Sequence, residues 1–379
     1  MTADRTVSAP VVIEPDAYAA RRERLRSRLE AVDADAALVT KLVNVRYLTG
    51  FTGSNGAVLV TRNGVVFCTD FRYDTQAAAE VPDVERIIVR HCAPALVERA
   101  AKDGLRRIAV EEHEITVEEH RKLSAELTAA APAAVLTGLG HAVEELRRVK
   151  DEREIALIRE ACAISDRALA ELTESILIGR TERHIAQELE RRMTDHGADG
   201  RAFDTIVASG PNAAVPHHRP GERRVGEGEF LKIDFGARYQ GYHADMTRTF
   251  VVGRAPADWQ VEVYDLVFAA QKAGRQALAP GARCADVDTA ARSVIEAAGY
   301  GEYFGHGLGH GVGLEIHEDP RLGAGLPGTL DDRTPVTVEP GVYLPGRGGV
   351  RIEDTLVVRP KAEGGPELLT ITTKELLVL

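Results

Sequence analysis

The sequence predicts two domains, an α/β domain followed by a larger α+β domain. At 379 residues the chain is longer than a typical single-core domain. Short apolar segments alternate with helical segments up to about Gly138, which is typical of an α/β domain. Beyond Lys150 a helix–helix–strand pattern occurs twice, which indicates an internal repeat. We therefore expect a first domain at residues 1–140 and a second domain at residues 141–379.

The first domain begins with a short lead-in, Met1–Pro15, which we expect to be partly disordered. The expected elements are a helix from Asp16 to about Ala31, strands at 36–39, 57–60, 65–68 and 108–110, and a helix at 117–130. Asn63-Gly64 between two apolar runs is a good hairpin signal. The basic run 21–28 lies on the first helix, where leucines recur at a spacing of four residues. This spacing favours the solvated face of an amphipathic helix over a nucleic-acid patch.

The second domain contains four predicted helices and a strand that leads into a histidine-containing loop. The helices are expected at 151–172, 181–196, 258–278 and 286–298, and the strand at 203–210. Ile155, Ile158 and Cys162 share one face of the first of these helices, as a packed amphipathic helix requires. Trp259 is the only tryptophan, and we expect it to pack against the core.

Two pairs of acidic residues each flank a predicted turn. Asp234 and Asp245 are symmetric about the Tyr239-Gln240 bond, so a hairpin centred there would place them opposite each other. Directly opposed residues have Cβ atoms roughly 4.5–5.5 Å apart on one face of the sheet. Each hairpin thus predicts a carboxylate pair on a single face.

The second pair is Glu339 and Glu353, which are symmetric about Gly346. Glycine supplies the positive φ that many turns require. The segments around the two pairs resemble each other, so a repeat related by pseudo-symmetry would bring four carboxylates to one centre. A Gly/His run, 305–311, lies between the hairpins, and we expect it to be extended because glycines permit close backbone approach.

Four converging carboxylates predict a metal site. Like charges that face each other inside apolar strands are destabilising unless a cation lies between them. Oxygen ligands with one imidazole suit Mn²⁺, Co²⁺ or Fe²⁺ at least as well as Zn²⁺. Two such ions can activate a water molecule and polarise a carbonyl group, so the pattern predicts a two-metal hydrolase.

With these motifs the chain resembles the pita-bread metallopeptidases, which include Xaa-Pro aminopeptidase and prolidase, with methionine aminopeptidase and creatinase as relatives. Asn44–Phe51 is similar to the N-terminal domain of the family, and Lys150–Ile155 to the start of its catalytic domain. The resemblance covers the whole chain. It implies a creatinase-like N-terminal α/β domain and an α+β pita-bread catalytic domain.

The resemblance also implies a set of metal ligands. They would be Asp234, Asp245, His310, Glu339 and Glu353. Asp245 and Glu353 would bridge two divalent ions, Asp234 would complete the shell of one, and His310 with Glu339 would complete that of the other. We expect Mn²⁺ first, with Co²⁺, Fe²⁺ or Zn²⁺ as alternatives. Creatinase lacks the metal-binding carboxylates, so the chain departs from creatinase here.

Four further residues match positions that act on the substrate or lie beside the metals. They are His217, His306, His317 and Arg351. A neutral imidazole accepts a proton or hydrogen-bonds a developing oxyanion. His218 adjoins His217, and we choose His217 because it follows a proline. Arg351 also fits a plain cross-strand ion pair.

The implied activity is hydrolysis of the peptide bond before proline, in a dipeptide or at the N-terminus of a longer peptide. The sequence does not decide between prolidase and Xaa-Pro aminopeptidase. The alternatives are a catalytically silent pita-bread binding protein and a methionine-aminopeptidase-like activity. Arg321 fits either a contact with a substrate carboxylate or a surface ion pair.

Composition excludes several other classes. The formal net charge of -11 argues against general nucleic-acid binding. The 4 cysteines are scattered, with no C-x-x-C, which disfavours a disulfide framework and fits a reducing cytoplasm. No apolar run is long enough to predict a membrane span, and no signal peptide is predicted. From the family we expect a homodimer or a higher homo-oligomer.

Overall fold

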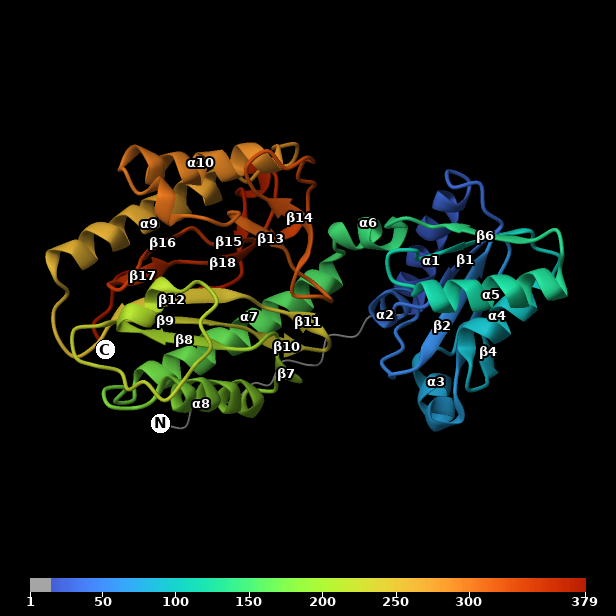
Figure 1. The fold of residues 1–379 in the computed structure, drawn as a ribbon, viewed down its shortest axis with the longest axis horizontal. Helices are drawn as coiled ribbons and strands as arrows, with labels where there is room; N and C mark the ends of the chain where they lie inside the picture. The colour runs from blue at the N-terminus through green and yellow to red at the C-terminus, as the bar shows by residue number, and fades with distance from the viewer. Residues whose placement is uncertain (1–14) are drawn as a thin grey trace. The chain divides into compact units, whose positions relative to one another are not determined.

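The computed structural model describes residues 15–379, and only Pro15 of the predicted lead-in lies within them. The described chain forms two compact units, one that ends at Arg147 and one that begins at Arg148. Figure 1 labels helices and strands of both units. Among the described residues, no helix has the length and apolarity needed to cross a bilayer.

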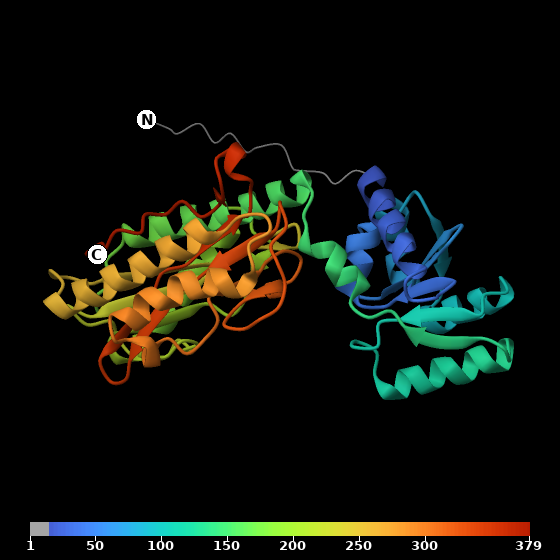
Figure 2. The same ribbon diagram turned by 90° about the horizontal axis from the view of Figure 1, so that it is seen from above.

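The first unit is a six-stranded sheet with helices on both faces. Its strand order is β4-β3-β2-β1-β5-β6, and only β2 runs antiparallel to its neighbours. The strands are β1 Ala36–Val39, β2 Gly56–Thr61, β3 Val65–Thr69, β4 Glu85–Ile88, β5 Arg107–Val110 and β6 Val135–Gly138. The helices are α1 Pro15–Leu29, α2 Leu42–Thr49, α3 Asp74–Glu80, α4 Cys92–Lys102, α5 Val117–Ala130 and α6 Ala142–Arg148. Figure 2 shows α1 and α5 on opposite sides of the strands.

Local signals explain most of these elements. The predicted strands and the helix at 117–130 are confirmed. The helix begins where it does because Thr116 and Glu119 form a capping box. Helices α2, α3, α4 and α6 and strands β4 and β6 were not predicted. Most of these segments are short, but α4 has a clear amphipathic pattern, with Cys92, Leu96 and Ala100 on its buried face, and the prediction missed it.

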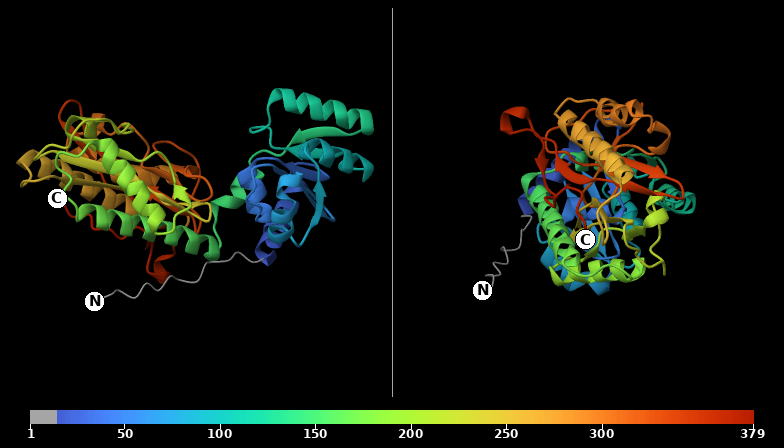
Figure 3. Two further views of the ribbon diagram at one scale, coloured as in Figure 1. Left: turned by 90° about the horizontal axis from the view of Figure 1, so that it is seen from below. Right: turned by 90° about the vertical axis from the view of Figure 1, so that its left-hand side faces the viewer.

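The second unit contains two helix pairs. They are α7 Glu152–Thr173 with α8 Glu182–Asp195, and α9 Asp258–Ala277 with α10 Cys284–Ala297. All four predicted helices are confirmed. Asp151 and Glu154 form a capping box at the start of α7, and Thr181 caps α8. The end-on view in Figure 3 shows the two pairs outside the strands.

The strands between the helix pairs form small sheets. They are β7 Gly200–Arg201, β8 Ile206–Ser209, β9 Phe230–Phe235, β10 Ala237–Tyr239, β11 Tyr242–His243, β12 Met246–Val251, β13 Gly309–Gly311, β14 Glu318–Leu322, β15 Pro335–Val338, β16 Gly341–Leu344, β17 Gly348–Arg351, β18 Asp354–Val357 and β19 Glu367–Leu368. Their orders are β12-β9-β8, β11-β10-β7, β14-β13-β15-β18-β19 and β16-β17. The strand predicted at 203–210 is shorter, at Ile206–Ser209.

The core of this unit has two halves, as the internal repeat predicts. Leu169 of α7, Leu189 of α8 and Ile233 of β9 belong to one buried cluster. Val267 of α9 and Val338 of β15 belong to the other. The second cluster also takes in Phe230 of β9 and Val251 of β12, so the two halves meet in the core. Trp259 packs against the second cluster and lies edge-on to Phe230, as expected.

In the first hairpin, the observed strand register differs from the predicted register. Its central pair is Tyr239 with Tyr242, so the turn lies at Gln240-Gly241, one residue later than predicted. Both turn residues have positive φ, 45° and 77°, as a two-residue type I′ turn requires. Asp234 consequently pairs with Thr247, and Asp245 lies two positions from the predicted register. Side chains two positions apart share a face, so the two acids become diagonal neighbours rather than opposed residues.

The second hairpin has the predicted register. The pairs Val338–Asp354 and Gly341–Arg351 are both centred on Gly346, whose φ is 74°. Glu339 and Glu353 lie between these pairs, where the strands are interrupted, so the register places them opposite each other. Asp245 occupies the corresponding interruption of the first hairpin, between β11 and β12.

Candidate metal centre

The acidic residues of both hairpins lie around His310 of the Gly/His run. The His310 Nε2 atom is 3.5 Å from Asp245 Oδ2 and 3.5 Å from Glu339 Oε1. Ligand atoms of Asp245, His310 and Glu353 all lie within 4.8 Å of one another. The predicted extended conformation holds for Gly309–Gly311, which form β13. Residues distant in the sequence thus converge on one buried spot.

The remaining acid, Asp234, joins the cluster through Arg351. The Arg351 guanidinium forms a buried ion pair with Asp234, and both side chains are nearly inaccessible to solvent. The same guanidinium donates to Thr247 Oγ1 over 3.0 Å and to the Tyr343 hydroxyl over 2.8 Å. Arg351 is therefore an integral part of the cluster and bonds across several strands, unlike an isolated cross-strand ion pair.

The buried carboxylates fit a cationic group. One oxygen each of Asp234, Asp245 and Glu353 is shielded from solvent and has no hydrogen-bond partner among the described residues. Burial, followed by the charge of the neighbouring Asp234, raises the pKa of Asp245 well above its usual range. Burial likewise raises the pKa of Glu353, and that of Glu339 to about 7. Unpaired buried carboxylate oxygens are costly, and metal ions are their usual partners.

Hydrogen bonds fix the orientation of the candidate ligands. The Thr247 hydroxyl donates to Glu353 Oε2 over 2.7 Å, which joins the first hairpin to the second. Thr355 Oγ1 donates to the backbone oxygen of Asp245 over 2.8 Å. His310 Nδ1 lies 2.9 Å from the Gly311 carbonyl oxygen. A proton on Nδ1 satisfies that carbonyl and leaves the Nε2 lone pair facing the acids, as a metal ligand requires.

The other predicted histidines lie around this cluster. The His317 ring is perpendicular to the His310 ring, at 4.5 Å between centroids. His306 Nε2 is 2.9 Å from the Tyr343 hydroxyl, the group that also contacts Arg351. Burial lowers the pKa of both His306 and His317 to about 4, so both imidazoles are neutral near pH 7.

The adjacent histidines His217 and His218 have different contacts. His218 Nε2 is 2.8 Å from Glu182, whose side chain is completely buried. Glu182 also accepts hydrogen bonds from Ser209 and Asn212, so it anchors the loop that follows β8. His217 lines the cavity beside the carboxylates and is not engaged by Glu182. These contacts favour His218 as a structural residue and leave His217 available for a substrate.

A second anchor of this loop is Lys232, which is fully buried in β9. Its ammonium group donates to the carbonyl oxygens of Ala213, Val215 and Pro216 over 3.1, 2.7 and 3.4 Å. The last of these residues immediately precedes His217. Burial lowers the pKa of Lys232 well below its usual range. This role was not predicted, because a lysine in a strand usually points to solvent.

Replacement of Lys232 by methionine is expected to displace His217 while leaving the carboxylates in place. Three carbonyl groups would lose their donor, which costs about 1–3 kcal/mol of stability. A shift of a substrate-positioning loop lowers kcat/KM by roughly 10- to 100-fold. Metal content and peptide hydrolysis of the purified variant measure the two effects separately. Full activity, or loss of metal together with activity, would contradict a role confined to the loop.

The carboxylates open into a cavity of about 300 Å³. It is lined by Phe203, Asp204, Thr205, Ile206, His217, His218, Arg219, Pro220, Asp234, Asp245, His310, Ile316, His317, Glu339 and Glu353. His306 and Arg351 are not among the lining residues. Phe203, Ile206 and Ile316 form an apolar part of the wall that the sequence analysis did not identify. An apolar wall beside oriented polar groups is typical of a small-molecule site.

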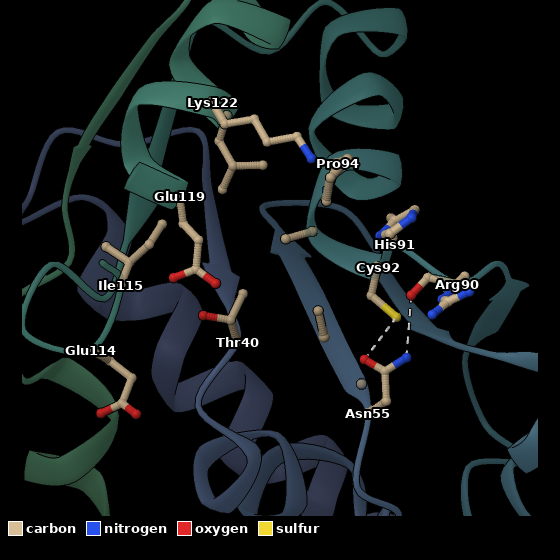
Figure 4. A pocket seen from close by; sticks show the side chains of 14 residues that line it. Thr40, Asn55, Arg90, His91, Cys92, Pro94, Glu114, Ile115, Glu119 and Lys122 are labelled. Atoms are coloured by element: carbon tan, nitrogen blue, oxygen red, sulfur yellow. Dashed lines mark hydrogen bonds between the residues drawn. The ribbon is translucent and has the colours of Figure 1, made fainter. Parts of the chain in front are cut away.

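Size alone does not locate the functional site. Another cavity, of about 400 Å³, lies in the first unit, where side chains from β2, α4 and α5 surround it (Figure 4). Its wall carries Arg90, Lys122, Glu114 and Glu119. Asn55 is held there by Arg90 and Cys92 (Figure 4). Its lining includes none of the unpaired buried carboxylate oxygens that distinguish the cluster around His310.

Comparison with known proteins agrees with this geometry. Residues 156–360 match metallopeptidase family M24, and residues 21–149 match the creatinase/prolidase N-terminal domain. A Xaa-Pro dipeptidase from Pyrococcus horikoshii is 35% identical over 94% of this chain and 99% of its own length. Solved structures of a Xaa-Pro dipeptidase from Bacillus anthracis and an X-Pro aminopeptidase from Thermotoga maritima are also similar. Their TM-scores are 0.89 and 0.85 and their identities 37% and 36%, with coverage of 96% and 93% of this chain and 100% of each structure.

These matches cover both units, which confirms the predicted fold of a creatinase-like N-terminal domain followed by a pita-bread catalytic domain. Family membership also confirms the predicted enzyme class. The chain is an enzyme of metallopeptidase family M24.

Proposed function

We propose that this enzyme hydrolyses the peptide bond between any residue and a following proline, with two divalent metal ions at the His310 cluster. The observation that carries the proposal is the convergence of four acids and His310 on one buried spot in an M24 chain. The names of the similar dipeptidases and aminopeptidase support the choice of substrate.

The charge of the cluster favours two ions over one. When ionised, the four acids carry four negative charges, and the directly paired Arg351 neutralises only one of them. One divalent ion would leave one negative charge, whereas two divalent ions together with one hydroxide would balance the remaining three. We propose Asp234, Asp245, His310, Glu339 and Glu353 as the ligands and Mn²⁺ as the preferred ion, with Co²⁺, Fe²⁺ and Zn²⁺ as alternatives. When bound, such ions supply a hydroxide nucleophile at neutral pH and polarise the scissile carbonyl group.

The side chains of the cavity then act on the peptide. Asp245 and Glu353, which lie closest to His310 with Glu339, would hold both ions. Glu339 lines the cavity, and we propose that it passes a proton to the leaving proline nitrogen. His217 and His317 line the same cavity and stabilise the oxyanion that forms during attack. Arg351 pairs with Asp234, and both His306 and Arg351 contact the Tyr343 hydroxyl. We propose that His306 contacts the substrate near the metal ions.

The length of the substrate distinguishes a prolidase from a Xaa-Pro aminopeptidase. We propose to assay the Mn²⁺-loaded enzyme on a Xaa-Pro dipeptide and a Xaa-Pro-Yaa tripeptide, each with and without chelator. Cleavage of the dipeptide alone identifies a prolidase, and cleavage of the tripeptide identifies a Xaa-Pro aminopeptidase. Cleavage of neither peptide by metal-loaded protein would overturn the proposed substrate. A cytoplasmic location and a homodimer or higher oligomer remain predictions from the sequence.

A further inference from the structure

A second group of metal-ligating side chains lies in the first unit. His113, His141 and Glu144 each offer a ligand atom, and these atoms all lie within 4.8 Å of one another. His113 belongs to the segment between β5 and α5, His141 directly precedes α6, and Glu144 lies in the first turn of α6. None of the three residues belongs to the catalytic cluster.

The distances within the group suit a small cation. The His113 Nε2 atom is 3.1 Å from Glu144 Oε1, and the two imidazole rings lie 4.1 Å apart at their centroids. In a tetrahedral zinc site, bond lengths of about 2.0–2.2 Å place neighbouring ligand atoms roughly 3.3–3.5 Å apart. The side chains of His113 and Glu144 are therefore already near the required separation. His141 is exposed, so its ring has room to turn toward them.

One carboxylate oxygen of Glu144 lacks the partner that a bound cation would provide. Its Oε1 atom accepts from Asn44 over 2.8 Å and lies 3.4 Å from the Lys41 ammonium nitrogen. Its Oε2 atom is shielded from solvent and has no hydrogen-bond partner among the described residues. A buried carboxylate oxygen without a donor is costly, and a cation bound by both oxygens of Glu144 would satisfy it.

The surrounding structure holds the group in place. Glu112 Oε2 accepts hydrogen bonds from the backbone N–H groups of Leu139 and Gly140, over 2.9 and 3.0 Å. Because Glu112 adjoins His113 and Gly140 adjoins His141, this carboxylate brings the two histidine-bearing segments together. Gly140 has φ of 62°, which glycine adopts without strain.

A second set of contacts orients Glu144 itself. Asn44 is fully buried and donates both to Glu144 and to Glu111. The Arg147 guanidinium donates to the side-chain oxygen of Asn44 over 2.7 Å, which fixes how the amide is turned. Supporting contacts of this kind orient the ligands of metal sites in proteins.

We propose that His113, His141 and Glu144 bind a zinc ion in the creatinase-like domain, separate from the catalytic ions. Two imidazoles and one carboxylate are a known zinc donor set, and a water molecule would complete the tetrahedron. The ion would join the segment after β5 to the first turn of α6, so we assign it a structural role. It replaces the direct hydrogen bond between His113 and Glu144.

Zinc binding by the full-length protein tests this proposal. We would equilibrate the chain with zinc-buffered solution at micromolar free ion and count bound zinc per chain by elemental analysis. The double variant His113→Asn/His141→Asn is expected to bind one zinc fewer than the unchanged chain. The variant Glu144→Gln keeps an oxygen acceptor for Asn44 but loses the charge, so it is expected to bind zinc more weakly.

The control is His91→Asn, which removes an exposed histidine of the same unit outside the group. It is expected to leave the zinc count unchanged. Circular dichroism and the Tm in chelator establish that each variant is folded before its zinc is counted. Equal zinc counts in the unchanged chain and the folded double variant would overturn the proposal, whatever the peptidase activity. Loss of one zinc in the double variant with no change in hydrolysis would support a structural ion.

Discussion

Replacement of Asp245 by alanine is expected to abolish hydrolysis and to lower the metal content of the purified enzyme. Asp245 lies at the centre of the cluster, 3.5 Å from His310, and one of its oxygens has no other partner among the described residues. Without Asp245, both proposed ions lose the ligand that would bridge them. Since the proposed ions would supply both the nucleophile and the polarisation of the carbonyl group, we expect activity to fall by at least about 10³-fold.

The decisive measurement is metal content together with kcat/KM on the Xaa-Pro dipeptide. Asp195→Ala is a matched control, because Asp195 pairs with Arg191 on an exposed helix face. That variant should retain metal and activity, since exposed ion pairs contribute little. An Asp245→Ala enzyme with full metal and full turnover would show that the centre lies elsewhere.

The parts of the fold that were predictable are those fixed by local signals. The capping residues Thr116, Asp151 and Thr181 mark helix starts in the sequence, and all three helices begin there. The second hairpin was predictable because Gly346 marks its centre. The first was misplaced because Gln240 adopts a positive φ, which is uncommon outside glycine.

The residues that support the site were less predictable than the acids that converge there. Lys232 and Glu182 both hold the His217 loop, yet their partners lie at least 16 residues away in the sequence. Tyr343 links His306 to Arg351 through its hydroxyl, and the strand pattern around it gave no sign of this contact. Such contacts arise from tertiary packing, which periodicity and composition do not encode.

Replacement of Arg351 by methionine is expected to destabilise the metal-free enzyme more than any surface substitution. The guanidinium is buried, pairs with Asp234, and also donates to Thr247, Tyr343 and the carbonyl oxygen of Pro216. Removal of one partner of a buried ion pair leaves an uncompensated charge and costs about 3–5 kcal/mol. Urea unfolding in the presence of chelator measures this loss without the added free energy of metal binding.

A double-mutant cycle with Asp234→Asn separates the ion pair from the other contacts of Arg351. If the pair dominates, the double variant loses less stability than the two single variants combined, because neither charge is then left alone. Additive losses would instead assign the cost to the neutral partners, Thr247 and Tyr343. Saturating Mn²⁺ is expected to reduce the loss of stability caused by Arg351→Met. Bound cations would offset the negative charge of the acids, which only Arg351 offsets in the metal-free enzyme. A deficit that does not change with metal would show that Arg351 and the metal ions act on separate groups.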